Sequence, residues 1–340
     1  MRILVTGAAG FIGFHLARAL AARGDAVIGI DNLNDYYAVS LKQDRLAALA
    51  AEAGDRFTFN QVDFADMAAL EAALAGQQVD RVVHLGAQAG VRYSIQNPHA
   101  YVQSNLVGHL NLLEFARHRQ LDHLVYASSS SVYGGNAKLP FAVEDRSDHP
   151  VSLYAATKRA DELVSESYAH LYRLPQTGLR FFTVYGPWGR PDMMLWIFTK
   201  AILAGQPIPV FNDGEMYRDF TYIDDLIEAI VRLTDRIPQR DAGDDSVSPV
   251  APYRIVNIGG GKPVALLDFI DTLEQAIGKK AIRNYLDMQK GDVPRTFASA
   301  ELLERLTGYR PDFDGETCQF GLDSRTFPST VLEIPFCRIR

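Results

Sequence analysis

The chain has 340 residues, enough to bury a large core, and 47% of them are hydrophobic, which excludes a disordered protein. Its 34 basic and 41 acidic residues give a formal net charge of −7, so no global positive field is present to hold nucleic acid or an anionic membrane. The two cysteines form neither a disulfide framework nor a metal-ligand pattern, and no apolar run reaches the ~18 residues of a membrane span. Because the start is also too short for a signal peptide, we expect a cytoplasmic protein.

Short β-branched runs alternate with helical patterns over the first 185 residues. The predicted strands, in chain order, cover residues 2–6, 26–31, 57–63, 81–86, 123–129 and 177–184. Apolar residues spaced three and four apart predict helices between them, at 11–23, 39–53, 67–75, 101–119 and 153–172. Because parallel neighbours need long right-handed connections, this alternation predicts a doubly wound parallel α/β sheet.

Residues 186–312 show no such alternation. They begin with a turn-rich segment at 186–191 and continue as a mixture of short helices and strands. We expect a smaller mixed α/β substrate lobe here, either separate from the first domain of residues 1–185 or interleaved with it. The polar stretch at 236–252 is predicted to form a surface loop.

A glycine-rich turn joins the first predicted strand to the first helix. Gly7, Gly10 and Gly13 let the backbone approach a pyrophosphate, whose charge then meets the helix N-terminus. A purely structural turn would use glycines in the same way, so the triad alone is weak. Asp31 strengthens it because a carboxylate about 20 residues on, at the end of the second strand, binds the adenosine ribose and repels a 2′-phosphate. The sequence therefore predicts NAD rather than NADP.

Two further strand ends lie at the same edge of the predicted sheet. Asp63 and Phe64 follow the third strand, where they can contact adenine. The small residues of Leu85-Gly86-Ala87 end the fourth strand and would let backbone approach the cofactor. Ordinary packing explains each of these features equally well.

Tyr154 and Lys158 lie four residues apart, on one face of a predicted helix. A phenol with its ordinary pKa of about 10 is a poor base at neutral pH, but a neighbouring ammonium and a positive nicotinamide ring both favour the phenolate. Such pairs occur by chance on many helices. This pair follows a strand that ends in the four serines 128–131, whose hydroxyls can hydrogen-bond a substrate oxygen. The pattern predicts a proton-transfer site beside a nicotinamide.

Together these motifs resemble the extended short-chain dehydrogenase/reductase family and, within it, the UDP-glucuronate 4-epimerases. The resemblance covers roughly residues 1–312, with matching stretches at 84–94, 127–134, 152–158, 180–193, 213–225 and 291–294. It implies a Rossmann domain in which Tyr154 takes the 4-hydroxyl proton while hydride leaves C4 for the nicotinamide. Lys158 would hold the nicotinamide ribose and favour the phenolate, and Ser129 would align the substrate. The 4-keto sugar would turn over and take the hydride back, so NAD stays bound.

The resemblance also implies the remaining contacts. Those to the cofactor are Gly7, Gly10, Phe11, Ile12, Gly13, Asp31, Asn32, Asp63, Phe64, Leu85, Gly86, Ala87, Asn105, Tyr154, Lys158 and Tyr185. Those to the UDP-sugar are Arg92, Ser129, Ser130, Thr183, Arg190, Val210, Phe211, Arg218 and Asp292. Arg218 matches a diphosphate-binding position and Asp292 a position near the nucleotide ribose, and we expect Arg190 to meet the sugar carboxylate.

Rival activities use the same oxidation step. Family members that decarboxylate UDP-glucuronate or dehydrate a sugar nucleotide carry an acid just before Val-Tyr-Gly, where this chain has Ser130 and Ser131. A UDP-glucose/galactose 4-epimerase is the nearest alternative. The two activities are distinguished by whether Arg190 and Thr183 contact a carboxylate of the substrate. A non-catalytic NAD-binding sensor would explain the cofactor motif but not the catalytic residues beside it.

Members of the family pair through two helices in each subunit. In this chain the corresponding helices are those predicted at 101–119 and 153–172. We therefore expect a homodimer that binds NAD and a UDP-sugar, with neither nucleic acid nor membrane as a partner.

The C-terminal segment 313–340 departs from the family, which ends with an aromatic-rich amphipathic helix. No helical period is visible in it, and both cysteines, Cys318 and Cys337, lie here. We hypothesise that the reading frame diverges near residues 313–318 and leaves a foreign tail.

Overall fold

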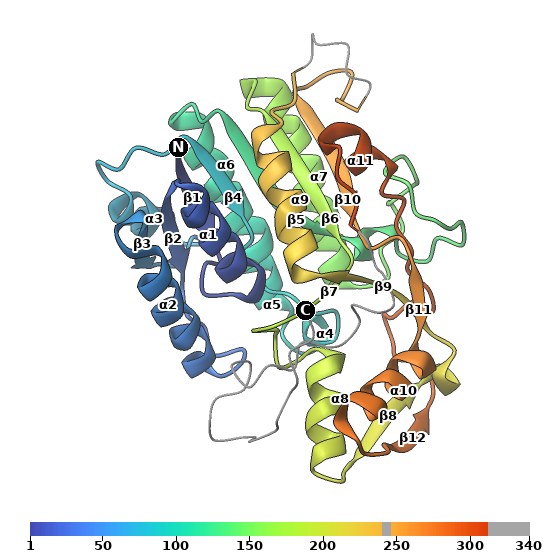
Figure 1. Cartoon of the computed structure of the whole chain (residues 1–340). Coiled ribbons are helices and arrows are strands. Elements are labelled where there is room, and N and C mark those ends of the chain that lie inside the picture. The colour runs from blue at the N-terminus through green and yellow to red at the C-terminus, as the bar shows by residue number, and fades with distance from the viewer. Residues whose placement is uncertain (240–245, 312–340) are drawn as a thin grey trace.

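The computed structural model describes residues 1–239 and 246–311, so the tail hypothesis lies outside the described residues. Its main body is a seven-stranded parallel sheet in the order β10-β6-β5-β4-β1-β2-β3 (Figure 1). The strands are β1 (Arg2–Thr6), β2 (Ala26–Asp31), β3 (Phe57–Gln61), β4 (Arg81–His84), β5 (His123–Ser129), β6 (Gln176–Phe181) and β10 (Tyr253–Ile258). The order runs outward in both directions from β1 and β4, which confirms the doubly wound prediction.

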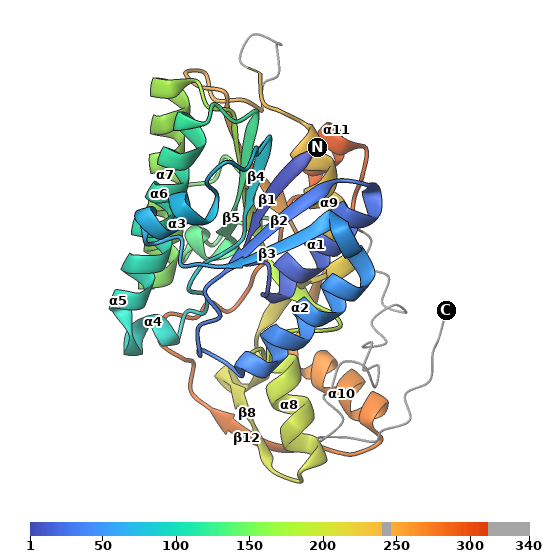
Figure 2. The same ribbon diagram turned by 90° about the vertical axis from the view of Figure 1, so that its left-hand side faces the viewer.

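Helices cover both faces of this sheet (Figure 2). On one face pack α1 (Phe11–Arg23), α2 (Val39–Ala53), α9 (Ile223–Asp235) and α11 (Glu301–Thr307). On the other face pack α3 (Met67–Ala73), α6 (Gly108–His118) and α7 (Leu153–Tyr172). The apolar side chains form one buried cluster on each face, which explains why strands such as β1 are apolar on both sides.

A smaller lobe stands beyond the carboxyl ends of the sheet. It contains α8 (Met194–Leu203), β8 (Pro207–Phe211), α10 (Leu266–Ile277) and β12 (Ile282–Leu286), where β12 pairs with β8 in parallel. A three-stranded sheet of β7 (Thr183–Tyr185), β9 (Tyr217–Tyr222) and β11 (Pro263–Ala265) lies between this lobe and the main body (Figure 1). Because β10, α9 and α11 return to the main body after residue 185, the two units are interleaved along the chain.

Two predicted elements are divided in the structure. The strand predicted over 177–184 is two strands, because β6 ends at Phe181 in the large sheet and β7 begins at Thr183 in the small one. The helix predicted over 101–119 is α5 (Pro98–Tyr101), a π-helical segment η2 (Val102–Val107) and then α6. The π-helical segment turns the side chain of Asn105 inward, where it is buried against the loop after β4 and against α7.

Short elements complete the described chain. They are α4 (Tyr93–Gln96) and the 3₁₀ segments η1 (Gly54–Arg56), η3 (Ser130–Tyr133) and η4 (Asn212–Gly214). In the predicted loop at 236–252, residues 236–239 and 246–252 contain neither helix nor strand, although Ala251 is fully buried. Within the described ranges, no helix combines the length and apolar character needed to span a membrane.

Candidate active site

The carboxyl ends of the parallel strands open into a cavity of about 450 Å³. It lies beside β1 and β4, the point at which the strand order reverses and where doubly wound sheets bind ligands. Most of the predicted site residues line it: Gly7, Gly10, Phe11, Ile12, Gly13, Asp31, Asn32, Phe64, Leu85, Gly86, Ala87, Ser129, Ser130, Tyr154, Lys158, Thr183 and Arg190. A second cavity, of about 560 Å³ beside β10 and α11, contains none of them, so size alone does not locate the site.

The glycine-rich turn is shaped for close approach. Gly7 has a φ of +69°, and a Cβ there would lie 2.8 Å from the backbone nitrogen of Gly86. A Cβ on Gly13 would lie 2.0 Å from the carbonyl oxygen of Gly7. The helix α1 begins after Gly10 without a side-chain cap and without an acidic residue in its first turn. Its positive end and its first N–H groups are therefore available to a pyrophosphate, and this cradle fits a dinucleotide.

Asp31 closes β2 at the edge of the cavity. Its Oδ1 accepts a hydrogen bond from the backbone N–H of Leu33 at 2.8 Å. Burial raises the pKa of the Asp31 carboxyl, while the N–H of Leu33 and the charge of Lys42 oppose that rise. Asp63 does not line the cavity. Its Oδ2 instead accepts from Asn32 Nδ2 at 3.1 Å and so holds a residue that does line it.

Helix α7 positions the predicted catalytic pair, Tyr154 and Lys158. Its N-cap, Ser152, accepts a hydrogen bond from the N–H of Ala155 at 3.1 Å, which fixes the first turn that carries Tyr154. One turn later, the side chain of Lys158 is only 3% exposed and its Nζ lies 3.0 Å from Asp161 Oδ2. The lysine is thus held by a buried carboxylate that the sequence analysis did not identify. Both Tyr154 and Lys158 line the cavity.

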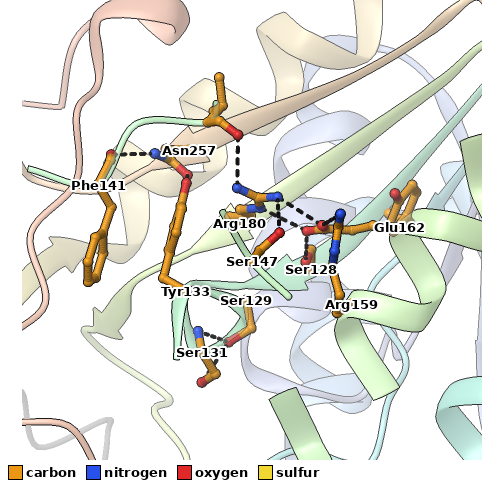
Figure 3. Close-up of polar contacts among 12 residues, drawn as sticks. Ser128, Ser129, Ser131, Tyr133, Phe141, Ser147, Arg159, Glu162, Arg180 and Asn257 are labelled. Carbon is orange, nitrogen blue, oxygen red and sulfur yellow. Dashed lines mark hydrogen bonds and ion pairs between the residues drawn. The ribbon is translucent and has the colours of Figure 1, made fainter. Parts of the chain in front are cut away.

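Hydrogen bonds hold Ser128 and Ser129, the serines at the end of β5, in place (Figure 3). Ser129 Oγ accepts from the N–H of Ser131 at 3.2 Å, and Ser128 Oγ donates to Glu162 Oε1 at 2.6 Å. Glu162, on α7, also accepts two hydrogen bonds of 2.9 Å from the guanidinium of Arg180 on β6. Burial alone would raise the pKa of Glu162, but these hydrogen bonds and the charge of Arg180 lower it. This network joins the strand that carries Ser129 to the helix that carries Tyr154.

Two predicted cofactor residues lie behind the cavity wall. Asn105 donates to the carbonyl of Gln88 at 3.1 Å and to Thr157 Oγ1 at 3.0 Å, and so ties the loop after β4 to α7. Tyr185 is buried in the cluster of the smaller lobe, with its ring edge-on to Phe220 at 6.0 Å. In this structure both residues shape the site from outside the cavity.

The predicted nucleotide-binding residues gather near the smaller lobe. Arg218 Nη2 donates to Asp292 Oδ1 at 2.7 Å, and the guanidinium of Arg92 lies 5.4 Å from the ring centroid of Phe211. Burial lowers the pKa of Arg218, Asp292 opposes this effect, and the charge of Arg92 adds to it. Two cations and an aromatic ring suit a nucleoside diphosphate. The side chain of Val210 is fully buried in the lobe, so only its backbone is available to a ligand.

Several residues of the cavity were missed by the sequence analysis. They come from the loops after β2 and β4, from α2, from η2 and from the segment after β7, and they include Asn34, Tyr36, Tyr37, Lys42, Gln88, Ser104 and Met193. Loops of this kind have no periodic spacing that marks which side chains face a ligand. The aromatic pair Tyr36-Tyr37, which follows Asp31 closely in the chain, is the feature of the sequence that could have indicated this part of the cavity.

Comparison with known proteins decides the family. Residues 3–259 match the model of the NAD dependent epimerase/dehydratase family. The chain belongs to this family. It is 52% identical over 322 residues to a probable UDP-glucuronate 4-epimerase of Rhizobium meliloti (strain 1021), covering 93% of this chain and 94% of that protein.

Two further proteins that are similar to this epimerase/dehydratase support the same family. UDP-glucuronate 4-epimerase 2 of Arabidopsis thaliana is 45% identical, over 93% of this chain and 73% of that protein. The crystal structure of UDP-glucuronic acid 4-epimerase from Bacillus cereus, in complex with UDP-glucuronic acid and NAD, is 34% identical. It superposes with a TM-score of 0.82 over 94% of this chain and 96% of that chain. The enzyme is accordingly NAD-dependent.

Proposed function

We propose that this enzyme interconverts UDP-glucuronate and UDP-galacturonate by epimerisation at C4, through a transient 4-keto sugar. NAD, when bound, supplies the acceptor and then the donor of the hydride. Tyr154 removes the proton of the 4-hydroxyl and later returns one, Lys158 holds the nicotinamide ribose, and Ser129 orients the sugar oxygen. The observation that carries the proposal is that these three side chains line one cavity with the glycine-rich turn.

We assign the UDP group to the contacts between the main body and the smaller lobe. Arg218 and Arg92 would meet the diphosphate oxygens, and Asp292 and Phe211 would meet the ribose and the uracil. The sugar would then extend toward Tyr154, with Arg190 facing its carboxylate. Arg190 supports this placement because it lines the same cavity as Tyr154.

We also propose a cytoplasmic homodimer that pairs through α6 and α7. Large apolar side chains are exposed on α7, at Leu163 (53%) and Leu171 (63%), and on α6 at Leu110 (42%). An apolar face of this kind is what a second copy would cover. Sedimentation should give a dimer mass that Leu163→Glu reduces to a monomer. Ile282→Glu, at an equally exposed apolar site on β12, should leave the dimer intact. A wild-type monomer would contradict the assignment.

The activity is tested by incubating the NAD-loaded enzyme with UDP-glucuronate and, separately, with UDP-glucose. We expect proton NMR to show conversion of UDP-glucuronate to UDP-galacturonate. Tyr154→Phe should slow this at least about 100-fold while NAD remains bound, because only the proton-transfer group is lost. Tyr172→Phe changes a half-exposed tyrosine of the same helix and should have no effect. Conversion of UDP-glucose alone would reject the uronate assignment.

A further inference from the structure

The chain itself supplies a carboxylate to the arginine assigned to the sugar. Arg190 Nε donates to Asp192 Oδ1 at 3.0 Å, and Arg190 Nη2 donates to Asp192 Oδ2 at 2.7 Å. Arg190 lines the cavity, and the two side chains are 25% and 27% exposed, so the pair lies beside the cavity and not in the core. Burial alone would raise the pKa of Asp192, but Arg190 lowers it, and the carboxylate is therefore ionised at neutral pH.

A tyrosine from a distant loop fixes this carboxylate. Tyr36 OH donates to Asp192 Oδ2 at 3.0 Å, although the two residues are 156 positions apart in the chain. The ring of Tyr36 packs on that of Tyr93, with centroids 4.8 Å apart. Burial and the charge of Asp192 raise the pKa of Tyr36 to about 12, so its hydroxyl remains a donor. Asp192 is thus held in place by contacts with both Arg190 and Tyr36.

This pairing occupies only one edge of the guanidinium. A guanidinium has five N–H donors, and Asp192 takes two of them. Within residues 1–239 and 246–311, Arg190 makes no other hydrogen bond, which leaves three N–H groups for a ligand. A sugar carboxylate bound there would share Arg190 with Asp192, so that two like charges would lie on either side of one guanidinium and repel each other. A neutral sugar brings a hydroxymethyl group to the same place and meets no such repulsion.

We propose that Asp192 is a specificity-determining residue. It weakens the binding of acidic sugars and so makes the difference in affinity between uronates and neutral sugars smaller than Arg190 alone would give. The inference rests on the proposed function, because it requires the carboxylate of the sugar to face Arg190. Asp192 gives Arg190 a fixed orientation but cancels its net charge. A uronate therefore binds to a neutral pair, with one attractive and one repulsive charge, and not to an isolated cation.

The test is calorimetric titration of UDP-glucuronate and of UDP-glucose into NAD-loaded enzyme that carries Tyr154→Phe, so that no turnover occurs. Adding Asp192→Asn removes the charge but keeps an oxygen that accepts from Arg190. We expect this change to tighten UDP-glucuronate binding roughly three- to tenfold, with the gain reduced by added salt, because the repulsion is electrostatic. UDP-glucose affinity should stay within a factor of two.

The chain offers a matched control on its surface. Arg146 and Asp148 form a pair with the same spacing, Nη2 to Oδ2 at 2.7 Å, in an exposed loop. Asp148→Asn makes the same change in net charge and should leave both affinities unchanged. Equal changes for the two sugars with Asp192→Asn would show a merely structural role and overturn the proposal. So would weaker UDP-glucuronate binding, which would mean that Asp192 acts only by orienting Arg190. A wild-type enzyme that binds UDP-glucuronate without converting it would reject the proposed function and leave this inference standing.

Discussion

Asp31 ends the second strand of the sheet, and its carboxylate lies in the wall of the cofactor cavity. It is 8% exposed, and its Oδ1 accepts from the N–H of Leu33 at 2.8 Å, which orients the carboxylate toward the position expected for the ribose hydroxyls. Its charge also opposes a 2′-phosphate, although Lys42 lies near enough to offset part of that charge. The predicted preference for NAD over NADP would therefore depend on a single carboxylate in a site that also contains a cation.

We predict that Asp31→Asn weakens NAD binding about tenfold and largely removes the preference over NADP. The amide keeps the shape and can still accept from Leu33, but the charge-assisted bonds to the ribose and the repulsion of a phosphate are lost. Protein equilibrated with both nucleotides can be assayed by mass spectrometry of what remains bound. Asp44→Asn, on the exposed side of α2, serves as the control. Unchanged selectivity would mean that another residue excludes NADP.

At the scale of elements, α7 connects the residues proposed as catalytic to the sheet. The side chain of Glu162 is fully buried, and its carboxylate accepts hydrogen bonds from three side chains (Figure 3). The donors are Arg180 on β6, Ser128 on β5 and Arg159 on the same helix. The burial of such a pair carries a large desolvation cost, which is offset only while both partners are present. The geometry at the end of β5 therefore depends on an ion pair outside the cavity.

We predict that Glu162→Gln lowers the free energy of unfolding by about 3 kcal/mol, because Arg180 keeps its charge in a buried position without a counter-ion. Urea unfolding followed by circular dichroism measures this loss. The control is Glu228→Gln on α9, which removes a pair of the same residue types, Glu228 with Arg232, from an exposed helix surface. That change should cost under about 1 kcal/mol. Similar losses in the two variants would rule out a special contribution from the buried pair.

Elements with a strong period were predictable, and those that depend on tertiary pairing were not. Strands β1, β2 and β5 and helices α1, α2 and α7 have the predicted bounds, because both the apolar spacing and the flanking turns are local. The change of sheet at Phe182 was missed because Phe182 itself favours a strand and no turn-forming residue separates β6 from β7. In the site, the glycine triad and the Tyr154/Lys158 pair have fixed spacings. The contact of Tyr36 with Asp192 joins two loops that are far apart in the chain, and no sequence spacing predicts it.

For the molecule as a whole, buried histidines give the folded state a dependence on pH. His15, His84, His109 and His123 are each at most 3% exposed. Burial lowers the pKa of His15 to about 4 and that of His123 to about 3, and it also lowers those of His84 and His109. In the unfolded chain all four titrate near 6.5. Below that pH the unfolded state binds more protons, so stability is lost as the pH falls from 6.5 toward 4.

Three carboxyls, those of Asp31, Asp219 and Asp224, act in the opposite direction, because burial raises their pKa values. Burial raises the pKa of Asp219 to about 6, against hydrogen bonds from backbone N–H groups that favour its ionised form. Its folded state therefore holds a proton more tightly than the unfolded chain, and stability rises as the pH falls from about 6 toward 3.8. Glu114 and Glu274, whose pKa values are lowered to about 2, lose their contribution only below about 4.5. Between pH 6.5 and 4.5 the four histidines outnumber the three aspartates, and the histidines begin to act at the higher pH.

We therefore predict that the free energy of unfolding falls steadily between pH 6.5 and 4.5, by up to about 1.4 kcal/mol per pH unit for each buried histidine. The urea midpoint of unfolding, measured across this pH range, follows the fall. His15→Gln tests one contribution, since a glutamine can still donate to the carbonyl of Pro187, which accepts from His15 at 3.0 Å. The variant should have a shallower slope by about one proton and a similar midpoint at pH 8. His118→Gln, at an exposed histidine, should leave the slope unchanged. A midpoint that stays constant from pH 7 to 5 would show that the four rings can be protonated without unfolding.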